Sequence, residues 1–396
     1  MPFILSVLIL LALNAHAQTS KPPCCPTVTL SDLAQARVSL SDLAQGEPVQ
    51  PAKVKLIYSS DIYFPPDDPD DWFDLATLFG TPGIDVAGVI LDQQLYGKRP
   101  QSEGTGAVPL QQMFAISGRT APYAIGLRTA LRSIDDTGLD QAAVCQNGVE
   151  MILDLLEKTE GKVIFLMVGT GRDIAAAYNR NPGLFRKKVS KIYLNAGIYG
   201  FPPGRFDVNL QKDRNAFIAI MKSGLPVYWA PCFGENNYET YWQAKQGKIL
   251  EPAARRLQNY FLYAFSKGTG KIGPAAGQTI ADPLEFLNRP LDMDELREVY
   301  GLSRNMWSTA SILDAAGLKI YKNKKGEYTS SRRPVGDFTQ EVKPYSFKRL
   351  KVFIDDQGRV HPGKPGNIEV FVFHKNDGDE YRNSLESVLR KTFGGF

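Results

Sequence analysis

The sequence predicts an α/β protein with a mostly parallel central sheet and helices on both faces of that sheet. From Lys53 onward, short blocks rich in Val, Ile and Leu alternate with longer amphipathic blocks, which is typical of strand–helix–strand units. The run Val163–Val168 is apolar throughout, as expected of a parallel strand that helices cover on both sides. We expect one domain over residues 53–396, with a small β addition near its C-terminus.

The expected elements follow one another along this domain. Strands are predicted at Val54–Tyr58, Val86–Leu91, Tyr123–Ile125, Val163–Val168, Val189–Leu194 and Pro226–Ala230. Helices are predicted at Asp71–Phe79, Gly148–Lys158, Ile174–Arg180 and Arg214–Ser223. Residues 233–315 are predicted to be mainly helical. The β addition is predicted from two strands and a last helix, at Leu350–Asp355, Ile368–His374 and Glu380–Phe393.

The first 52 residues are predicted to lie outside this domain. Residues 1–17 have the pattern of a signal peptide, because Phe3–Leu13 is apolar and Ala15-His16-Ala17 fits a small-x-small cleavage site. The apolar run is shorter than the ~20 residues of a membrane span. The mature protein is therefore expected to be secreted or periplasmic, with no membrane contact. Residues 18–52 are predicted to be a linker or low-complexity tail.

Composition excludes several classes of function. The 396 residues include 46 Lys and Arg and 42 Asp and Glu, and without a basic stripe this balance does not predict nucleic-acid binding. Only three histidines occur. His16 leaves with the signal peptide, and His361 and His374 lie near the C-terminus, so a mechanism that needs histidine earlier in the chain is excluded. No CxxC spacing occurs among the cysteines, so no zinc site is expected.

One acidic stretch stands out, between a predicted strand and a predicted helix. The window Ser59–Asp74 contains Asp at 61, 67, 68, 70, 71 and 74. Two carboxylates about 4 Å apart repel by about 4 kcal/mol at an effective dielectric constant near 20. The stretch is therefore either a solvated loop or a place where protons or a cation offset the charge. Its position favours a binding site, because open α/β sheets bind ligands at the carboxyl ends of their strands.

The acidic stretch resembles the opening motif of the inosine-uridine-preferring nucleoside hydrolase family. In that family a strand is followed by an Asp-rich motif and a helix. Asp61 corresponds to the second Asp of the opening pair, Ser59 stands in place of the first, and Asp70-Asp71 correspond to the paired carboxylates at the helix start. The resemblance extends over roughly residues 53–396 and implies a nucleoside hydrolase-like, Rossmann-like fold.

Two later blocks extend the resemblance. Val163–Ala177 resembles a strand–turn–helix segment of the family, with Val168 where a backbone carbonyl binds metal and Asp173 where the family has Asn. The resemblance implies that Asp61, Asp71 and the carbonyl of Val168 hold Ca²⁺ through oxygen ligands. It also implies hydrolysis of an N-ribosyl bond, with Asp70 as the general base that takes a proton from the metal-bound water.

The second block, Tyr193–Asn215, resembles the family's glycine-rich turn followed by E-F-N-x-x-x-D-P. Asp207 stands where the family has Glu, and Asn209 and Asp213 match. The resemblance implies that Asp207 and Asn209 bind the ribose hydroxyls, which suits an acceptor and a mixed donor–acceptor two positions apart.

The sequence departs from the family at a late helix. There the family has a His-Asp pair that completes the metal site and helps the leaving base, whereas the matching segment here, Asn305–Ala310, has neither residue. An aromatic side chain is expected to hold the base instead, by stacking. Trp307 is the predicted residue, and Trp242 and Tyr241 are the alternatives.

These observations leave three hypotheses. The first is an exported, metal-dependent hydrolase of nucleosides or related N-glycosides, and the second is a ribose- or nucleoside-binding protein without turnover. The third is a secreted interaction protein whose acidic loop is only solvated. The expected partner under the first two is a small-molecule substrate, and a homo-oligomer is left open.

Overall fold

The computed structural model describes residues 53–396 except 65, 67–68, 93–94, 97–98, 101–105 and 270–281, and only the backbone of 95–96, 99–100 and 266–269. All described residues belong to one unit, Ala52–Phe396. The predicted signal peptide and tail lie outside the described residues, and so do Asp67 and Asp68 of the acidic stretch.

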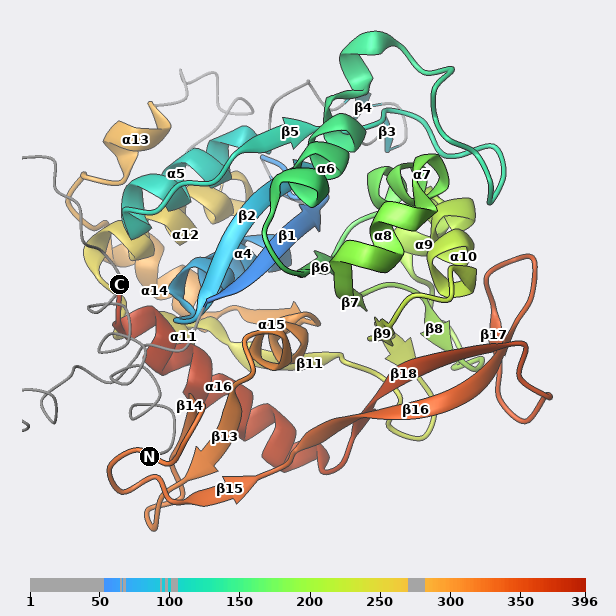
Figure 1. Ribbon diagram of the computed structural model, residues 1–396. Helices are drawn as coiled ribbons and strands as arrows, with labels where there is room; N and C mark the ends of the chain where they lie inside the picture. The colour runs from blue at the N-terminus through green and yellow to red at the C-terminus, as the bar shows by residue number, and fades with distance from the viewer. Residues whose placement is uncertain are drawn as a thin grey trace, which may run out of the picture. The chain divides into compact units, whose positions relative to one another are not determined.

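The sheet at the centre of this unit has 11 strands among the described residues, in the order β10-β8-β17-β16-β18-β9-β7-β6-β1-β2-β5 (Figure 1). Its strands, in chain order, are β1 Val54–Ser60, β2 Ile84–Leu91, β5 Tyr123–Ile125, β6 Val163–Met167, β7 Val189–Leu194, β8 Ile198–Tyr199, β9 Val227–Trp229, β10 Phe233–Gly234, β16 Tyr345–Ile354, β17 Val360–His361 and β18 Ile368–Lys375. Pairing is parallel from β5 to β18, and β16 pairs antiparallel with β18 and β17.

Hydrophobic clusters cover both faces of the sheet. Side chains alternate along a strand, so Leu56 and Tyr58 of β1 belong to the first cluster and Ile57 belongs to the second. The first cluster includes helices α4 Asp70–Gly80, α5 Ala107–Ser117, α12 Arg255–Thr269, α15 Thr309–Ala315 and α16 Gly378–Gly394. The second includes α6 Asn147–Lys158, α7 Arg172–Arg180, α8 Pro182–Lys188 and α10 Arg214–Lys222. The predicted fold class is confirmed.

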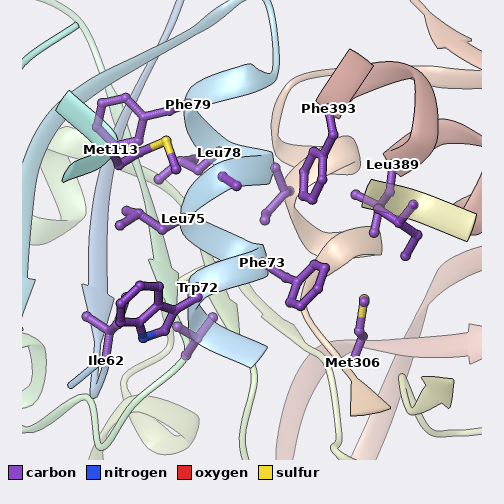
Figure 2. Packing of buried hydrophobic residues seen from close by; sticks show 14 of the residues in the cluster. Ile62, Trp72, Phe73, Leu75, Leu78, Phe79, Met113, Met306, Leu389 and Phe393 are labelled. Atoms are coloured by element: carbon purple, nitrogen blue, oxygen red, sulfur yellow. The ribbon is translucent and has the colours of Figure 1, made fainter. Parts of the chain in front are cut away.

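Helix α4 carries the acidic motif into the core. Every residue from 72 to 79 is buried, so other elements cover the helix around its whole circumference, and Asp74 and Thr77 are its buried polar residues. In Figure 2, Phe73 points toward Phe393 of α16, and the two ring centroids are 6.0 Å apart, while Trp72 points to the other side of the helix. This packing fixes the first turn of α4, which contains Asp70 and Asp71.

Smaller elements complete the unit. They are β3 Leu95–Tyr96, β4 Arg99–Pro100, α9 Val208–Lys212, β11 Trp242–Lys245, α11 Gln246–Leu250, α13 Pro283–Phe286, α14 Met293–Gly301, β12 Ser303–Met306, β13 Lys319–Lys322, β14 Tyr328–Ser331, β15 Gln340–Val342 and a 3-10 turn at Ala143–Cys145. Within the described ranges, no helix has the length and apolar character that crossing a bilayer requires.

One expectation about these elements was wrong. The late helix does not begin near Asn305, because Ser303–Met306 forms strand β12 and α15 begins at Thr309. Strand β12 pairs with β11, which lies far earlier in the chain, and a local pattern does not reveal such a partner. The predicted C-terminal β addition is present, and β13, β14 and β15 add a further antiparallel sheet.

Candidate functional site

Residues that directly follow the parallel strands form one edge of the sheet. Asp61 follows β1, Asp92 follows β2, Val168 follows β6 and Asn195 follows β7. The backbone amides of Asp92, Val168 and Asn195 each donate to a carbonyl of the neighbouring strand at 2.9 Å. The sheet pairing therefore continues one residue beyond the strands, and these residues lie side by side at the carboxyl edge.

Four carboxylates gather at this edge, and we call them the acidic cluster: Asp61, Asp70, Asp71 and Asp74. Burial raises the pKa of Asp71 well above its ordinary value, and the charges of Asp61, Asp70 and Asp74 raise it further. A side-chain hydrogen bond with Asp61 also raises the pKa of Asp71. The structure thus brings the three predicted acidic site residues together.

Helix α9 supplies a cation and an amide to the same edge. The Lys212 ammonium lies 2.6 Å from Oδ2 of Asp61, and the side chains of Lys212 and Asp61 are only 15% and 12% exposed. The Asn209 side chain donates from Nδ2 to the carbonyl of Val168 at 3.0 Å. Two of the three groups predicted to bind Ca²⁺ are therefore engaged by nitrogen atoms of the chain itself.

This donor set does not fit the predicted Ca²⁺ site. A calcium ion takes roughly six to eight oxygen ligands. Here the Asp61 carboxylate is in an ion pair with Lys212, and the Val168 carbonyl accepts a hydrogen bond from Asn209. Among the described residues, no group of three or more His, Cys, Asp or Glu has an arrangement that would hold a metal ion.

Asp207 holds α9 in place. Its Oδ1 accepts a hydrogen bond from the amide of Leu210 at 2.7 Å, which is an N-cap interaction. It also accepts from the amide of Gly197 and from the thiol of Cys232. Burial raises the pKa of Asp207 despite these bonds. Ribose binding by Asp207 and Asn209 stays a prediction, since the contacts described for both are made within the protein.

Trp307 lies in an aromatic cluster with Phe233 and Tyr241. Its ring is edge-on to Phe233 at 6.0 Å between centroids and tilted against Tyr241 at 5.8 Å. The Arg205 guanidinium lies over Phe233 at 4.8 Å from the ring centroid. Nε1 of Trp307 is buried and has no hydrogen-bond partner among the described residues.

Asn195 is a site candidate that sequence reasoning missed. Its side chain is 2% exposed, and neither Oδ1 nor Nδ2 has a hydrogen-bond partner among the described residues. Tyr193, two positions earlier on β7, packs in the same hydrophobic cluster as α4, so Asn195 points to the face of the sheet that α4 covers. Its place directly after a predicted strand was the one sequence signal for it.

Asp92 was also missed, although it directly follows a predicted strand. Its Oδ2 accepts hydrogen bonds from the amide and the hydroxyl of Thr170 at 2.5 and 2.7 Å, and its Oδ1 accepts from the Ser59 hydroxyl at 3.2 Å. Burial, followed by the charge of Asp61, raises the pKa of Asp92. Asp92 therefore links β1 and β2 to the turn that follows β6.

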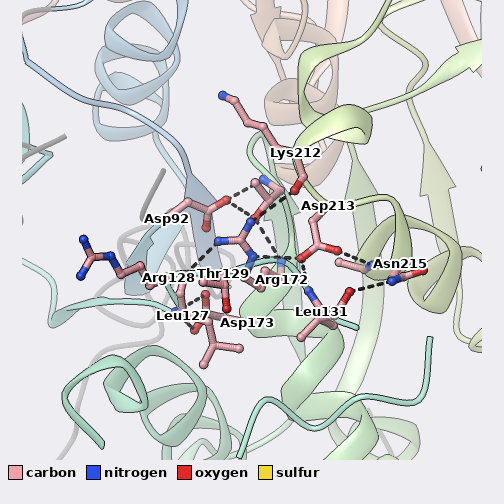
Figure 3. A network of polar contacts seen from close by, with 12 residues as sticks. Asp92, Leu127, Arg128, Thr129, Leu131, Arg172, Asp173, Lys212, Asp213 and Asn215 are labelled. Carbon is pink, nitrogen blue, oxygen red and sulfur yellow. Dashed lines mark hydrogen bonds and ion pairs between the residues drawn. The ribbon is translucent and has the colours of Figure 1, made fainter. Parts of the chain in front are cut away.

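A buried polar network supports the edge from the other face of the sheet (Figure 3). The Arg172 guanidinium donates from Nε to Oδ2 of Asp213 at 2.9 Å and from Nη1 to the Leu127 carbonyl at 3.0 Å. Oδ2 of Asp213 also accepts from the amide of Leu131 at 3.0 Å. These bonds fix the loop after β5 and the junction between α9 and α10.

Asp173 is the second carboxylate of this network. Its oxygens accept from the amide of Leu127 at 3.0 and 3.2 Å. The carboxylate lies against Gly126 and Gly148, where a Cβ atom would collide with it. Burial, followed by the charge of Asp92, raises the pKa of Asp173 to about 7.

Comparisons with known proteins bear on the fold. No protein-family model matches the chain, and no curated protein matches it by sequence. A plant nucleoside hydrolase is similar in structure, with 17% sequence identity, a TM-score of 0.50, and coverage of 86% of this chain and 99% of that chain. An inosine-uridine-preferring nucleoside hydrolase from Bacillus anthracis is 12% identical, with a TM-score of 0.48 and coverage of 85% of this chain and 99% of that chain.

The similarity to the plant enzyme spans nearly the whole of that protein. The chain has a nucleoside hydrolase-like α/β fold.

Proposed function

We propose that this chain hydrolyses the N-glycosidic bond of a nucleoside or a related N-glycoside, releasing the free base and the free sugar. One observation carries the proposal. At a single edge of the sheet, the acidic cluster at the start of α4 is accompanied by Asn195, a buried amide whose two polar atoms have no partner among the described residues. Buried polar groups are nearly always paired in folded proteins, so this amide is expected to find its partner in a ligand.

The chemistry of the reaction matches these groups. Cleavage passes through an oxocarbenium-like state, with a water activated on one face of the sugar and the departing base on the other. In this proposal Asp70 accepts the proton of that water as the general base. The raised pKa of Asp71 beside it favours the neutral form of that carboxyl group, which lowers the negative charge that a substrate has to meet.

Polar side chains and one aromatic side chain recognise the substrate in this proposal. The Asn195 amide offers two donors on Nδ2 and an acceptor on Oδ1, which suits sugar hydroxyl groups because each both donates and accepts. Asp207 and Asn209 remain the proposed ribose contacts further along the edge. Trp307 holds the base, with its partnerless Nε1 as a donor to a ring nitrogen or carbonyl.

The Ca²⁺ prediction is not carried into this proposal. It came from the resemblance, and nitrogen atoms of α9 contact two of its three protein ligands. Export to a secreted or periplasmic location stays a proposal that rests on residues 1–17 alone.

A second function, nucleoside binding without turnover, is favoured by one observation. Asn305 lies in the segment where the resembling family has its late His-Asp pair, and its Oδ1 accepts hydrogen bonds from the Tyr241 hydroxyl at 3.0 Å and from Gln243 at 2.9 Å. The acid that would help the base to leave is therefore not supplied by this strand.

Release of free sugar distinguishes the two functions. The mature chain is incubated with a panel of purine and pyrimidine nucleosides, and reducing sugar is measured over time. We expect release by the wild type and a loss of about 100-fold or more in Asp70→Asn, the range that removal of a general base gives. Asp356→Asn is the matched control, because the Asp356 side chain is 99% exposed.

The other outcomes are equally informative. Calorimetric binding of a nucleoside without release of sugar selects the binding protein. Neither binding nor release across the panel would refute both functions, and equal activity in Asp70→Asn and wild type would remove Asp70 from the mechanism.

A further inference from the structure

The ion pair between Lys212 and Asp61 is placed where the resembling family is expected to have its metal. Asp61 directly follows β1, and the Lys212 ammonium contacts its Oδ2 at 2.6 Å. Both side chains are largely removed from water, at 15% and 12% exposure. A lysine is rarely buried to this extent unless it is paired, so we interpret the ion pair as a structural part of this sheet edge.

The backbone around Lys212 fixes where its ammonium can reach. Lys212 is the last residue of α9, and the next residue, Asp213, is both the C-cap of α9 and the N-cap of α10. Asp213 is in turn held by Arg172 (Figure 3). At the other end of α9, Asp207 forms the N-cap. The helix is thus anchored at both ends, and Lys212 is directed to the acidic cluster by the fold.

The second nitrogen of α9 completes the arrangement. Asn209 is three residues before Lys212, on the same side of the helix, and donates to the Val168 carbonyl at 3.0 Å. One short helix therefore occupies both a carboxylate and a carbonyl that a divalent ion would need. An ion coordinated by Asp61 would also lie at contact distance from the ammonium, where two positive charges repel strongly.

We propose that the Lys212 ammonium replaces a divalent cation as the counter-charge of the acidic cluster, so that the site is assembled and occupied by substrate without metal. The inference rests on the ion pair and applies to the site of the proposed function. Lys212 acts in it as a positioning residue, because its ammonium holds the Asp61 carboxylate in place through the ion pair.

Calcium binding tests this inference without any need for turnover. Wild type, Lys212→Met and Lys222→Met are compared by calorimetric titration with CaCl₂ and by thermal melting in EDTA or in millimolar Ca²⁺. Met keeps the length of the side chain and removes the charge. Lys222, on neighbouring α10, is the control, because it lies 3.8 Å from the fully exposed carboxylate of Asp356.

We expect wild type and Lys222→Met to show no heat of calcium binding in the titration. Each of these two proteins should have the same melting temperature in EDTA and in Ca²⁺. Lys212→Met should melt lower than the control in EDTA, because Asp61 loses its counter-charge. Ca²⁺ should then raise its melting temperature with the concentration dependence of a ligand that binds the native state. Lys212→Arg, which keeps the charge, should resemble wild type.

Two results would overturn the inference. One is calcium binding by the wild type that Asp61→Asn abolishes. The other is a Lys212→Met protein whose melting temperature in EDTA equals that of the control and does not change when Ca²⁺ is added. If Lys212→Met does not fold, the wild-type titration decides alone, and calcium binding there counts against the inference.

Sugar release by the wild type in EDTA separates this inference from the proposed function. Release that persists in EDTA supports both. Release that requires Ca²⁺ retains the function and refutes the metal-free site. Absence of release, together with absence of calcium binding, refutes the hydrolase while the ion pair keeps its role.

Discussion

Breaking the buried pair between Arg172 and Asp213 is expected to destabilise the protein severely. The two side chains are 5% and 0% exposed, and Nε of Arg172 lies 2.9 Å from Oδ2 of Asp213. Asp213→Asn keeps the size of the side chain and preserves a good N-cap for α10, so the substitution chiefly removes the negative charge. It removes the carboxylate that contacts the buried guanidinium at 2.9 Å, and breaking a buried ion pair costs roughly 3–5 kcal/mol in other proteins.

Urea unfolding followed by fluorescence at neutral pH measures this loss. Asp294→Asn is the control, because Asp294 and its partner Arg297 are 78% and 72% exposed, and an exposed pair contributes about 0–1 kcal/mol. Against a typical total of about 5–15 kcal/mol, Asp213→Asn should shift the midpoint far below that of the control. A difference of less than about 1 kcal/mol between the variants would show that Arg172 finds other compensation, contrary to the electrostatic reasoning.

Two further predictions concern buried polar groups. The pKa of Asp173 is raised from 3.8 to about 7, so the native state binds more protons than the unfolded state between these two pH values. The contribution of Asp173 to the free energy of unfolding therefore falls as pH rises through this window, by up to about 4 kcal/mol. Asp173→Asn should reduce the change of the urea midpoint with pH between about pH 4 and pH 7. An unchanged pH dependence in this variant would contradict the raised pKa of Asp173. Asn195→Leu removes a buried amide that has no partner among the described residues, so we expect it to raise the free energy of unfolding by about 1–3 kcal/mol while nucleoside binding is lost. A destabilised variant that still binds would show that Asn195 has a structural role only.

The sequence predicts those parts of the fold that depend on local pattern. The continuous apolar run at Val163–Val168 corresponds to β6, and the predicted helix start at Asp71 differs by one residue from the first residue of α4. The carboxyl edge follows from these elements, because parallel strands followed by helices place their C-terminal residues together. Asp61, Asp70 and Asp71 could therefore be placed at one edge before any coordinates were known.

The parts that escaped prediction depend on contacts between distant segments. Lys212 and Asp61 are 151 positions apart, and nothing in the sequence next to either residue shows that they meet. Asn195 could be placed after a strand, but an amide is unpaired only when none of its neighbours supplies a partner, which requires the whole fold. Among the described residues, strands β11 and β12 pair with each other and with no other strand, so their formation also depends on two segments that are distant in the chain.

The account is tested most directly by a crystal structure of Asp70→Asn with an intact nucleoside soaked in, prepared in EDTA. We predict the sugar at the carboxyl edge of β1, β6 and β7, with a hydroxyl group within hydrogen-bond distance of the Asn195 amide and the base beside Trp307. The Lys212 ammonium should remain on Asp61. A nucleoside bound elsewhere on the molecule, or an edge that stays empty at saturating nucleoside, would contradict the account.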